Sequence, residues 1–219
     1  MFFRNKPLEF SISLAGTNVG EVINKILFIA EKCKNPQLRG LCFLIKENCD
    51  FEVIVSDTFR LAVISFPNAI KNSDGKCDFF IALDQLPSFI IRLQSEGVSF
   101  SVSEREIAFQ DGLKIKCLRN SRVSSYLSSY ETLIPKPEKY RLYISREEVE
   151  HFQNPVDRNC LQFPLAGVSP KIVVNREYFL DAFRILGDRL TVSIKEIRGP
   201  ILIKGENKNT IYLLMPIAQ

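Results

Sequence analysis

Apolar residues recur at helical spacing in the N-terminal half of the chain. Between residues 17 and 32 they fall every three or four positions, which is the spacing of a helix with one buried face. Asn18 and Glu21 are placed as a capping pair at the start of this segment. Asp84 is placed to cap a second helix, and Gly97 is placed to end it. Both segments predict amphipathic helices.

Two further helices are predicted in the C-terminal half. Ser145 and Glu148 have the spacing of a capping box for a short helix, which Pro155 would end. Asn175 is placed to cap a longer helix that runs to Gly187.

Short segments rich in β-branched and aromatic residues fill the chain between these helices and predict strands. One predicted strand leads into each helix, at residues 8–15, 78–83, 140–145 and 171–175. Others lie at residues 38–49, 51–57, 60–66, 98–104, 106–112 and 113–120. The recurring unit of strand, helix and several strands predicts an α+β fold with antiparallel sheets and with helices on one face.

The spacing of the helices predicts two domains of unequal size. The expected helix starts, near 17, 84, 145 and 175, are separated by 67, 61 and 30 residues, so one unit has lost about half of its length. Residues 121–139 are rich in serine and proline, which is typical of a linker. We therefore expect a full domain at 1–120, a linker at 121–139 and a shortened domain at 140–219.

Composition sets limits on the class of protein. A chain of 219 residues with 46% hydrophobic residues is long enough to bury a core, and its formal charge of +4 permits a nucleic acid partner without requiring one. We found neither a signal peptide nor a transmembrane run in the sequence, so we expect a cytoplasmic protein. The six cysteines lack the CxxC spacing of metal or redox sites, and we expect them to be small core residues.

Motifs for catalysis are missing from the sequence. None of the common phosphate-binding, hydrolase or zinc-protease motifs occurs in it. The single histidine, His151, fits an exposed surface position better than a general base or a metal ligand. The carboxylates between Glu147 and Glu150 lack further ligand spacing for a metal. The sequence thus favours a binding module over an enzyme, with no cofactor and no metal.

Three short segments resemble the beta subunit of bacterial DNA polymerase III, the sliding clamp. The segment VSDTFRLAV (55–63) is similar to a middle-domain segment that normally contains Thr-Asp-Gly-His-Arg-Leu-Ala. SSYETLIPKP (128–137) is similar to the segment that enters the last domain, and IYLLMPIAQ (211–219) is similar to the C-terminus. The resemblance covers nearly the whole chain, and it implies a reduced paralogue made of the middle domain and a shortened last domain.

The resemblance also implies a peptide-binding cleft between the two domains, where polymerases and other partners insert a short segment. A cleft with a flexible methionine suits varied peptides. The residues carried over to this cleft are Ser56, Thr58, Phe59, Arg60, Leu61, Pro135, Tyr178, Leu213, Met215, Pro216 and Ile217. The alternative is that 211–215 is simply a buried strand, with Leu213 and Met215 on one face and Tyr212 on the other.

Several positions depart from the family pattern. The Gly-His pair of the family is replaced by Thr58 and Phe59, which puts a bulky ring where a smaller group is usual, and the terminal Arg-Leu is replaced by Ala218 and Gln219. These departures predict a narrowed or altered cleft. A counterpart of the family's first domain is missing.

The clamps of this family also surround duplex DNA, and their helices offer basic residues to its phosphates without reading sequence. Basic residues expected on the outer faces of the helices here are Lys25, Lys32, Arg92, Arg176 and Arg184. They are either phosphate contacts or ordinary solvated residues.

The family ring holds six similar domains, so a two-domain chain would close a ring with three copies. The three prolines Pro155, Pro164 and Pro170 suit a protected sheet edge, and we therefore favour an open assembly, a monomer or a dimer. The expected function is a replication or repair accessory factor that binds partner peptides. The alternative is a clamp-fold adaptor, or a transcription-associated regulator, that does not encircle DNA.

Overall fold

The structure is a computed structural model that divides into two compact units. It describes residues 7–12, 19–73, 75–94, 98–119, 121–136, 138–152, 157–163, 165 and 171–217. The first unit contains the described residues up to Asp57 together with Val63–Tyr130, and the second contains Thr58–Ala62 and the described residues from Glu131 onwards. The strand β4 (Arg60–Phe66) therefore begins in the second unit and ends in the first.

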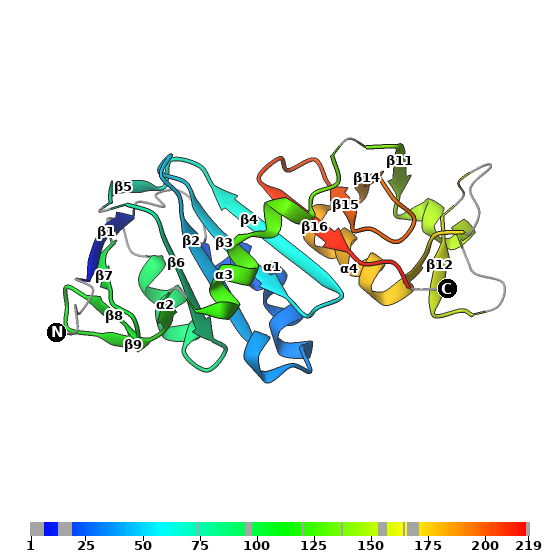
Figure 1. The fold of residues 1–219 in the computed structure, drawn as a ribbon. Helices are drawn as coiled ribbons and strands as arrows, with labels where there is room; N and C mark the ends of the chain where they lie inside the picture. Colours follow the sequence, from blue (N-terminus) through cyan, green and yellow to red (C-terminus); the bar gives the residue numbers. More distant parts are fainter. Residues whose placement is uncertain are drawn as a thin grey trace. The chain divides into compact units, whose positions relative to one another are not determined.

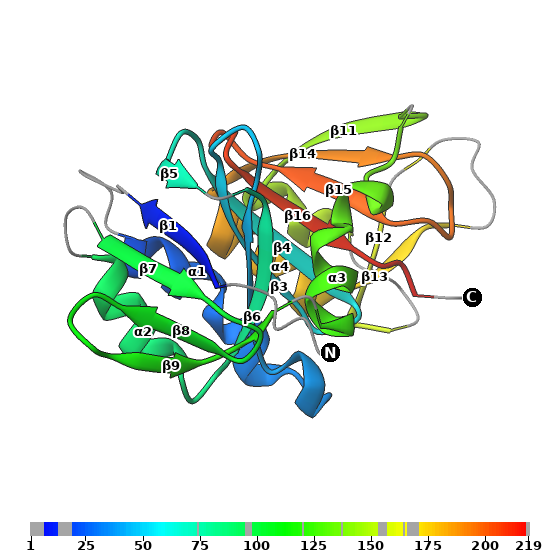
Figure 2. The same cartoon turned by 60° about the vertical axis from the view of Figure 1, so that its left-hand side comes forward.

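The first unit contains two antiparallel sheets and two of the predicted helices. The helices are α1 (Val19–Lys32) and α2 (Leu86–Leu93). One sheet has the order β5 (Ile70–Ser73), β1 (Leu8–Ile12), β7 (Val98–Val102), β8 (Glu106–Phe109) and β9 (Lys114–Lys116). In the other sheet, β10 (Leu118–Arg119), β6 (Cys77–Ala82), β2 (Gly40–Ile45), β3 (Phe51–Ser56) and β4 (Arg60–Phe66) are neighbours in that order. Figure 2 shows β1, β7, β8 and β9 side by side.

An aromatic cluster joins the two sheets of the first unit. The ring of Phe89 on α2 lies 4.8 Å from the ring of Phe43 on β2 and 6.0 Å from that of Phe79 on β6, measured between centroids. It also lies 6.0 Å from the ring of Phe100 on β7 in the other sheet. Because edge-to-face rings at these distances bury large areas, one helix residue fastens both sheets into a single core.

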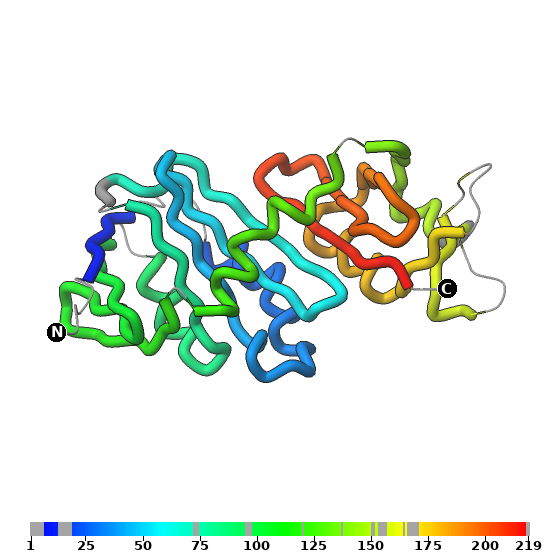
Figure 3. The backbone as a smooth tube through the Cα atoms, viewed as in Figure 1, coloured from blue at the N-terminus to red at the C-terminus, as the bar shows by residue number. Residues whose placement is uncertain are grey.

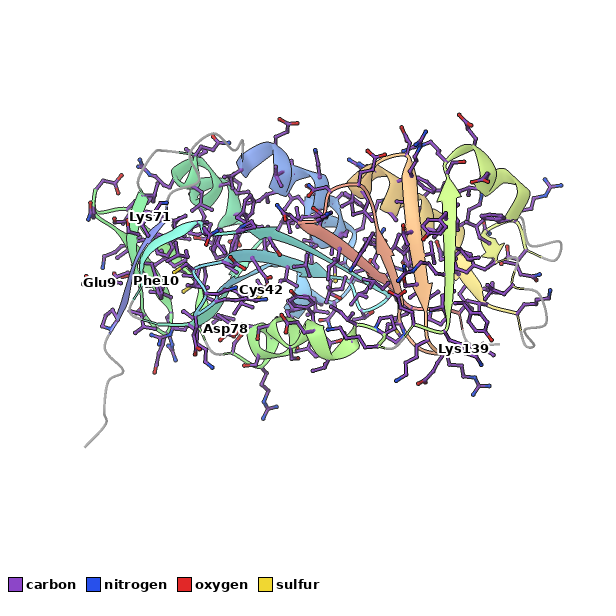
Figure 4. The ribbon with its side chains drawn as sticks, turned by 90° about the horizontal axis from the view of Figure 1, so that it is seen from above. Glu9, Phe10, Cys42, Lys71, Asp78 and Lys139 are labelled. Atoms are coloured by element: carbon purple, nitrogen blue, oxygen red, sulfur yellow. The ribbon has the colours of Figure 1, made fainter. Side chains whose placement is uncertain are left out.

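A helix that the sequence did not predict lies within the segment expected to be a linker. α3 (Arg122–Ser128) is capped by Ser121, whose hydroxyl accepts a hydrogen bond from the backbone N–H of Ser124. It is followed by a 3-10 turn, η2 (Tyr130–Leu133), before the chain enters β11 (Tyr140–Ser145), and Figure 3 shows the path of the backbone. α1 and α3 lie on opposite sides of β2 and β3 (Figure 4), so these strands are buried on both faces.

The described residues of the second unit form one four-stranded antiparallel sheet, a short strand pair and one α-helix (Figure 1). The sheet strands are, in order, β16 (Thr210–Leu214), β15 (Ile201–Lys204), β14 (Arg189–Ile194) and β11 (Tyr140–Ser145). The pair consists of β12 (Cys160–Gln162) and β13 (Val173–Asn175), and the helix is α4 (Arg176–Leu186). The core is centred on Phe179. The centroid of its ring lies 5.3 Å from that of Phe163 and 5.7 Å from that of Phe183.

The structure confirms three predicted helices and changes details of two. Asn175 caps α4 by accepting a hydrogen bond from the N–H of Tyr178, and Gly187 ends it with φ of 97°. The expected helix after Ser145 is a 3-10 turn, η3 (Glu147–Phe152), although Glu148 accepts a hydrogen bond from the N–H of Ser145 as the capping box predicts. The cap of α2 is Gln85 and not Asp84.

The expected α+β fold with antiparallel sheets is confirmed. The expected helix boundaries at Asn18, Gly97 and Pro155 lie outside the described residues. Within the described chain, every helix is too short or too polar to cross a membrane.

Candidate functional site

Two backbone hydrogen bonds fix the described C-terminal residues to the second unit. After β16, the N–H of Met215 donates to the carbonyl of Phe59 at 2.8 Å, and the N–H of Ile217 donates to the carbonyl of Val173 at 2.8 Å. Pro216, which lies between them, has no N–H to satisfy. Met215 and Ile217 therefore lie against the turn that precedes β4 and against the start of β13.

Below this turn, a cation is held between a carboxylate and an aromatic ring. The side chain of Arg60 is fully buried and pairs with the carboxylate of Asp181 on α4. The guanidinium carbon lies 4.2 Å from the ring centroid of Tyr178, close enough for a cation–π interaction. The ring of Phe59 stacks against Tyr178 with centroids 6.2 Å apart. Contacts thus run from Phe59 through Tyr178 and Arg60 to Asp181, and we call these four residues the column.

The backbone of Tyr178 is fixed on both sides, which sets the position of its ring. Its N–H donates to the side chain of Asn175 at 3.0 Å. Its carbonyl accepts a hydrogen bond from the hydroxyl of the buried Tyr212 at 2.8 Å. The first turn of α4 is therefore tied to β16, and a binding group on it is already in place before any ligand arrives.

Apolar side chains at the outer end of the column are open to solvent. Phe59 is 57% exposed, Ile217 is 42% exposed and Met215 is 39% exposed. We call the residues Phe59, Tyr178, Met215, Pro216 and Ile217 the Phe59 surface. Exposed apolar groups gathered in one place are a frequent sign of a protein-binding site.

The turn that presents Phe59 has an unusual backbone. Thr58 has φ of 81°, a left-handed conformation that is costly for a β-branched residue. Glycine adopts it without penalty, and glycine is the residue at the similar position of the clamp segment. The left-handed backbone is therefore present here although a threonine occupies the position.

The other residues expected in the cleft differ in their surroundings. Leu61 and Leu213 are buried, and Leu213 lies opposite Leu202 in the sheet. Pro135 is also buried and lines a separate hollow of about 280 Å³ with Lys136 and Lys195. Ser56, at the end of β3, belongs to the first unit, whereas every other expected cleft residue belongs to the second.

Asp181 was not predicted. It lies on the buried face of α4, where a carboxylate is unusual, and that position is the signal that could have identified it.

The basic residues expected to contact DNA are spread over both units. Lys25, Lys32 and Arg184 are exposed. Arg92 pairs with Asp111 at 2.8 Å, and the ammonium of Lys32 lies 5.8 Å from the ring of Phe28. Arg176 is half-buried at the start of α4.

The prediction that all cysteines are core residues is wrong for Cys49. This residue is exposed, in a turn where it has φ of 68°, whereas the other five are buried. Burial raises the pKa of Cys77 and of Cys117 to about 12, so these thiols stay protonated at neutral pH. Among the residues that the structure describes, no group of histidine, cysteine and acidic side chains could hold a metal ion. The side chain of His151 lies outside that set.

Comparison with known proteins gives a result at the level of the fold. Neither a family model nor a curated protein matches the sequence. Among solved structures, the Helicobacter pylori beta clamp bound to a DNA ligase peptide matches all of this chain and 68% of its own, with a TM-score of 0.70 and 16% identity. This chain has the sliding-clamp fold.

Two more clamps give the same result. DNA polymerase III subunit beta from Pseudomonas aeruginosa has a TM-score of 0.69 at 16% identity, with 69% of its chain covered. The beta subunit from Thermotoga maritima has a TM-score of 0.69 at 15% identity, with 68% covered. The chain spans about two thirds of each clamp, which fits the expectation of a reduced clamp.

Proposed function

We propose that this chain is a non-catalytic, clamp-like accessory protein of replication or repair that binds short partner peptides on the Phe59 surface. The observation that carries the proposal is the exposure of Phe59, Met215 and Ile217, together with the stacking of Phe59 against the fixed Tyr178. Two solved clamps support it by their ligands: the H. pylori clamp is bound to a DNA ligase peptide, and a P. aeruginosa clamp is bound to griselimycin.

The chemistry of the surface suits an extended peptide with apolar anchors. Met215 is flexible and polarisable, so it adapts to leucine or phenylalanine side chains. The rings of Phe59 and Tyr178 offer a flat contact, and their position costs little entropy on binding because Tyr178 is already held. We expect binding of a peptide of the clamp-binding type, with a glutamine followed by leucine and phenylalanine.

Titration of a labelled peptide of this type tests the proposal. Met215→Ala removes an anchor contact, and we expect it to weaken binding by about 2 kcal/mol, or roughly 30-fold in Kd. Ile91→Ala is the matched control, because Ile91 is 63% exposed but lies on α2 in the first unit. Absence of binding, or equal Kd values for the two variants, would contradict the proposal.

Contact with duplex DNA is the second part of the proposal. The exposed helix residues Lys25, Lys32 and Arg184 support binding to duplex DNA that is indifferent to its sequence. This binding should be weak, because few counterions would be released, and it should be lost as the salt concentration rises. The pairing of Arg92 with Asp111 lowers its contribution. Replacing both Lys25 and Arg92 with glutamine should reduce the affinity for duplex DNA below that of the unaltered protein. An unchanged affinity would place the contact elsewhere.

An adaptor or transcription-associated regulator that does not encircle DNA is the alternative. It is favoured by the second unit, whose described residues form one four-stranded sheet and a short strand pair where the first unit has two five-stranded sheets. Mass determination in solution at several protein concentrations separates the two functions. A stable trimer would favour a closed ring, and a monomer or dimer would favour the adaptor.

A further inference from the structure

The register of the second sheet places its polar side chains on one face. Directly opposite residues of antiparallel strands share a face. Tyr143 of β11 lies opposite Thr191 of β14, which lies opposite Lys204 of β15. The next row towards the start of β14 pairs Ser145 with Arg189.

The intervening rows carry the buried apolar residues of the other face. These are Ile144 with Leu190, and Val192 with Ile203. One face of the sheet is therefore core. The opposite face is buried at Ser193, Leu202 and Leu213, and its other rows present an aromatic ring among cations. We call Arg141, Tyr143, Arg189, Thr191 and Lys204 the Tyr143 face.

Tyr143 is the most exposed large hydrophobic side chain of the described residues, at 73%. A hollow of about 500 Å³ lies beside it. Tyr143, Thr191 and Arg189 line it, together with the acidic residues Glu148 and Glu206. A flat ring beside a hollow of this size gives a ligand ring a surface on which to stack.

The wall that carries Glu206 depends on a close approach between two backbones. A Cβ atom at Gly205 would lie 2.1 Å from the carbonyl oxygen of Leu186, at the end of α4. Only glycine lets the turn after β15 come this near to the helix. The opposite wall is also fixed, because Glu148 accepts hydrogen bonds from both the N–H and the hydroxyl of Ser145. The hollow is therefore built from positioned elements.

The charges on this face point to a ligand with three chemical parts. Arg141 is held by Glu138, with Nε 2.8 Å from the carboxylate, and Lys204 and Arg189 are exposed, so three cations are arranged around the ring. The two carboxylates of the hollow are hydrogen-bond acceptors. A ligand that complements the face has an anionic group, amine or amide donors, and a planar ring. A nucleotide with an exposed base has all three, whereas a base inside a duplex is already stacked and cannot reach Tyr143.

We propose that the Tyr143 face binds single-stranded nucleic acid, with one base stacked on Tyr143 and its amine edge towards Glu148 and Glu206. The flanking phosphates lie against Arg141, Arg189 and Lys204. Because the carboxylates offset part of the positive charge, the binding is weak and sensitive to salt. This site differs from both the Phe59 surface and the helix residues proposed to contact duplex DNA.

Fluorescence anisotropy with a labelled oligo(dC) of about 12 nucleotides tests the proposal on the full chain. Tyr143→Ala should raise Kd by about fivefold or more, since stacking of one base is lost. Tyr126→Ala is the matched control, because Tyr126 is 53% exposed but lies on α3 in the first unit. No binding by the unaltered protein, or equal Kd values for the two variants, would overturn the proposal.

A second variant, a duplex competitor and an RNA oligomer separate this site from the other proposed contacts. Replacing Arg141 and Lys204 with glutamine should lower the salt dependence, and a duplex of the same length should compete poorly. A duplex that competes as well as the single strand would overturn the proposal. The Kd of oligo(rC) is measured beside that of oligo(dC), and the tighter binding identifies whether the site prefers RNA or DNA. Tyr143→Ala should leave peptide binding unchanged, so failure here is distinguishable from failure of the peptide site.

Discussion

Glu52 in the first unit and Asp181 in the second are both buried carboxylates, and they are stabilised in different ways. Glu52 in the first unit is 3% exposed and accepts hydrogen bonds from Tyr130 at 3.1 Å and Ser65 at 3.0 Å. The ammonium of Lys46 lies 2.9 Å from the same side chain. Asp181 in the second unit pairs with Arg60, and the ring of Tyr178 covers the guanidinium.

The difference lies in the exposure of the cation. The side chain of Lys46 is 25% exposed, so water shares in solvating its charge, whereas the side chain of Arg60 has no exposure at all. A fully buried guanidinium has to be balanced by groups of the protein itself. The first network fastens Tyr130, at the end of the first unit, to the sheet, while the second lies directly below the Phe59 surface. We infer that the second network is the more sensitive to loss of its carboxylate.

Asp181→Asn should have the largest effect. The amide has nearly the same shape but carries no charge, so the buried Arg60 loses its ion-pair partner, and breaking a buried pair in this way costs about 3–5 kcal/mol. Unfolding in urea, followed by circular dichroism, measures the loss. Glu147→Gln is the control, because Glu147 is exposed in the same unit, and it should change the stability by less than about 0.5 kcal/mol. Equal midpoints for the two variants would refute the comparison.

Glu52→Gln should have an intermediate effect of about 1–3 kcal/mol. The amide oxygen still accepts from Tyr130, and the partly exposed Lys46 regains water, so less is lost than at Asp181. The same urea titration gives the value. Adding Lys46→Met should recover part of the loss, because it removes the cation that pairs with Glu52 in the unaltered protein. A loss larger than that of Asp181→Asn would reverse the order that we infer.

Neither network could have been predicted from the sequence. Glu52 and Tyr130 are separated by 78 residues, and Arg60 and Asp181 by 121, so no local pattern joins them. The elements that carry these residues were predictable, because β3 and β4 are rich in β-branched and aromatic residues and α4 has a period of 3.6. The sequence thus predicts the elements, and the pairing of buried charges depends on how these elements pack.

α3 was missed for a different reason. It has seven residues, only two of which are buried, and four of the positions from 121 to 128 are serine, which favours caps and turns. Its stability comes from packing on β2 and β6, which a periodicity within the segment does not reveal. Part of the candidate site was accessible from the three segments that resemble the clamp, whereas Asp181 and the Tyr143 face lie outside those segments.

The smallest expected effect concerns the turns at the two ends of β4, one in each unit. Thr58 and Asn68 both have positive φ, at 81° and 55°. Asparagine tolerates this conformation well and β-branched threonine does not, so glycine should help only at Thr58. We expect Thr58→Gly to stabilise the protein by about 0.5 kcal/mol, since relief of strain exceeds the entropy that glycine adds to the unfolded chain. Asn68→Gly should be neutral or slightly destabilising.

Thermal unfolding of the two variants side by side measures this difference. A gain at Thr58 alone would mean that the turn presenting Phe59 holds strain that the matching turn of the first unit lacks, as sites that bind ligands often do. Equal gains would remove this distinction between the units. The peptide affinity of Thr58→Gly shows whether the strain has a role in binding. If the variant binds peptide more weakly while it is more stable, the strained turn holds Phe59 in its binding position. If the affinity is unchanged, the strain at Thr58 only lowers the stability of the folded protein.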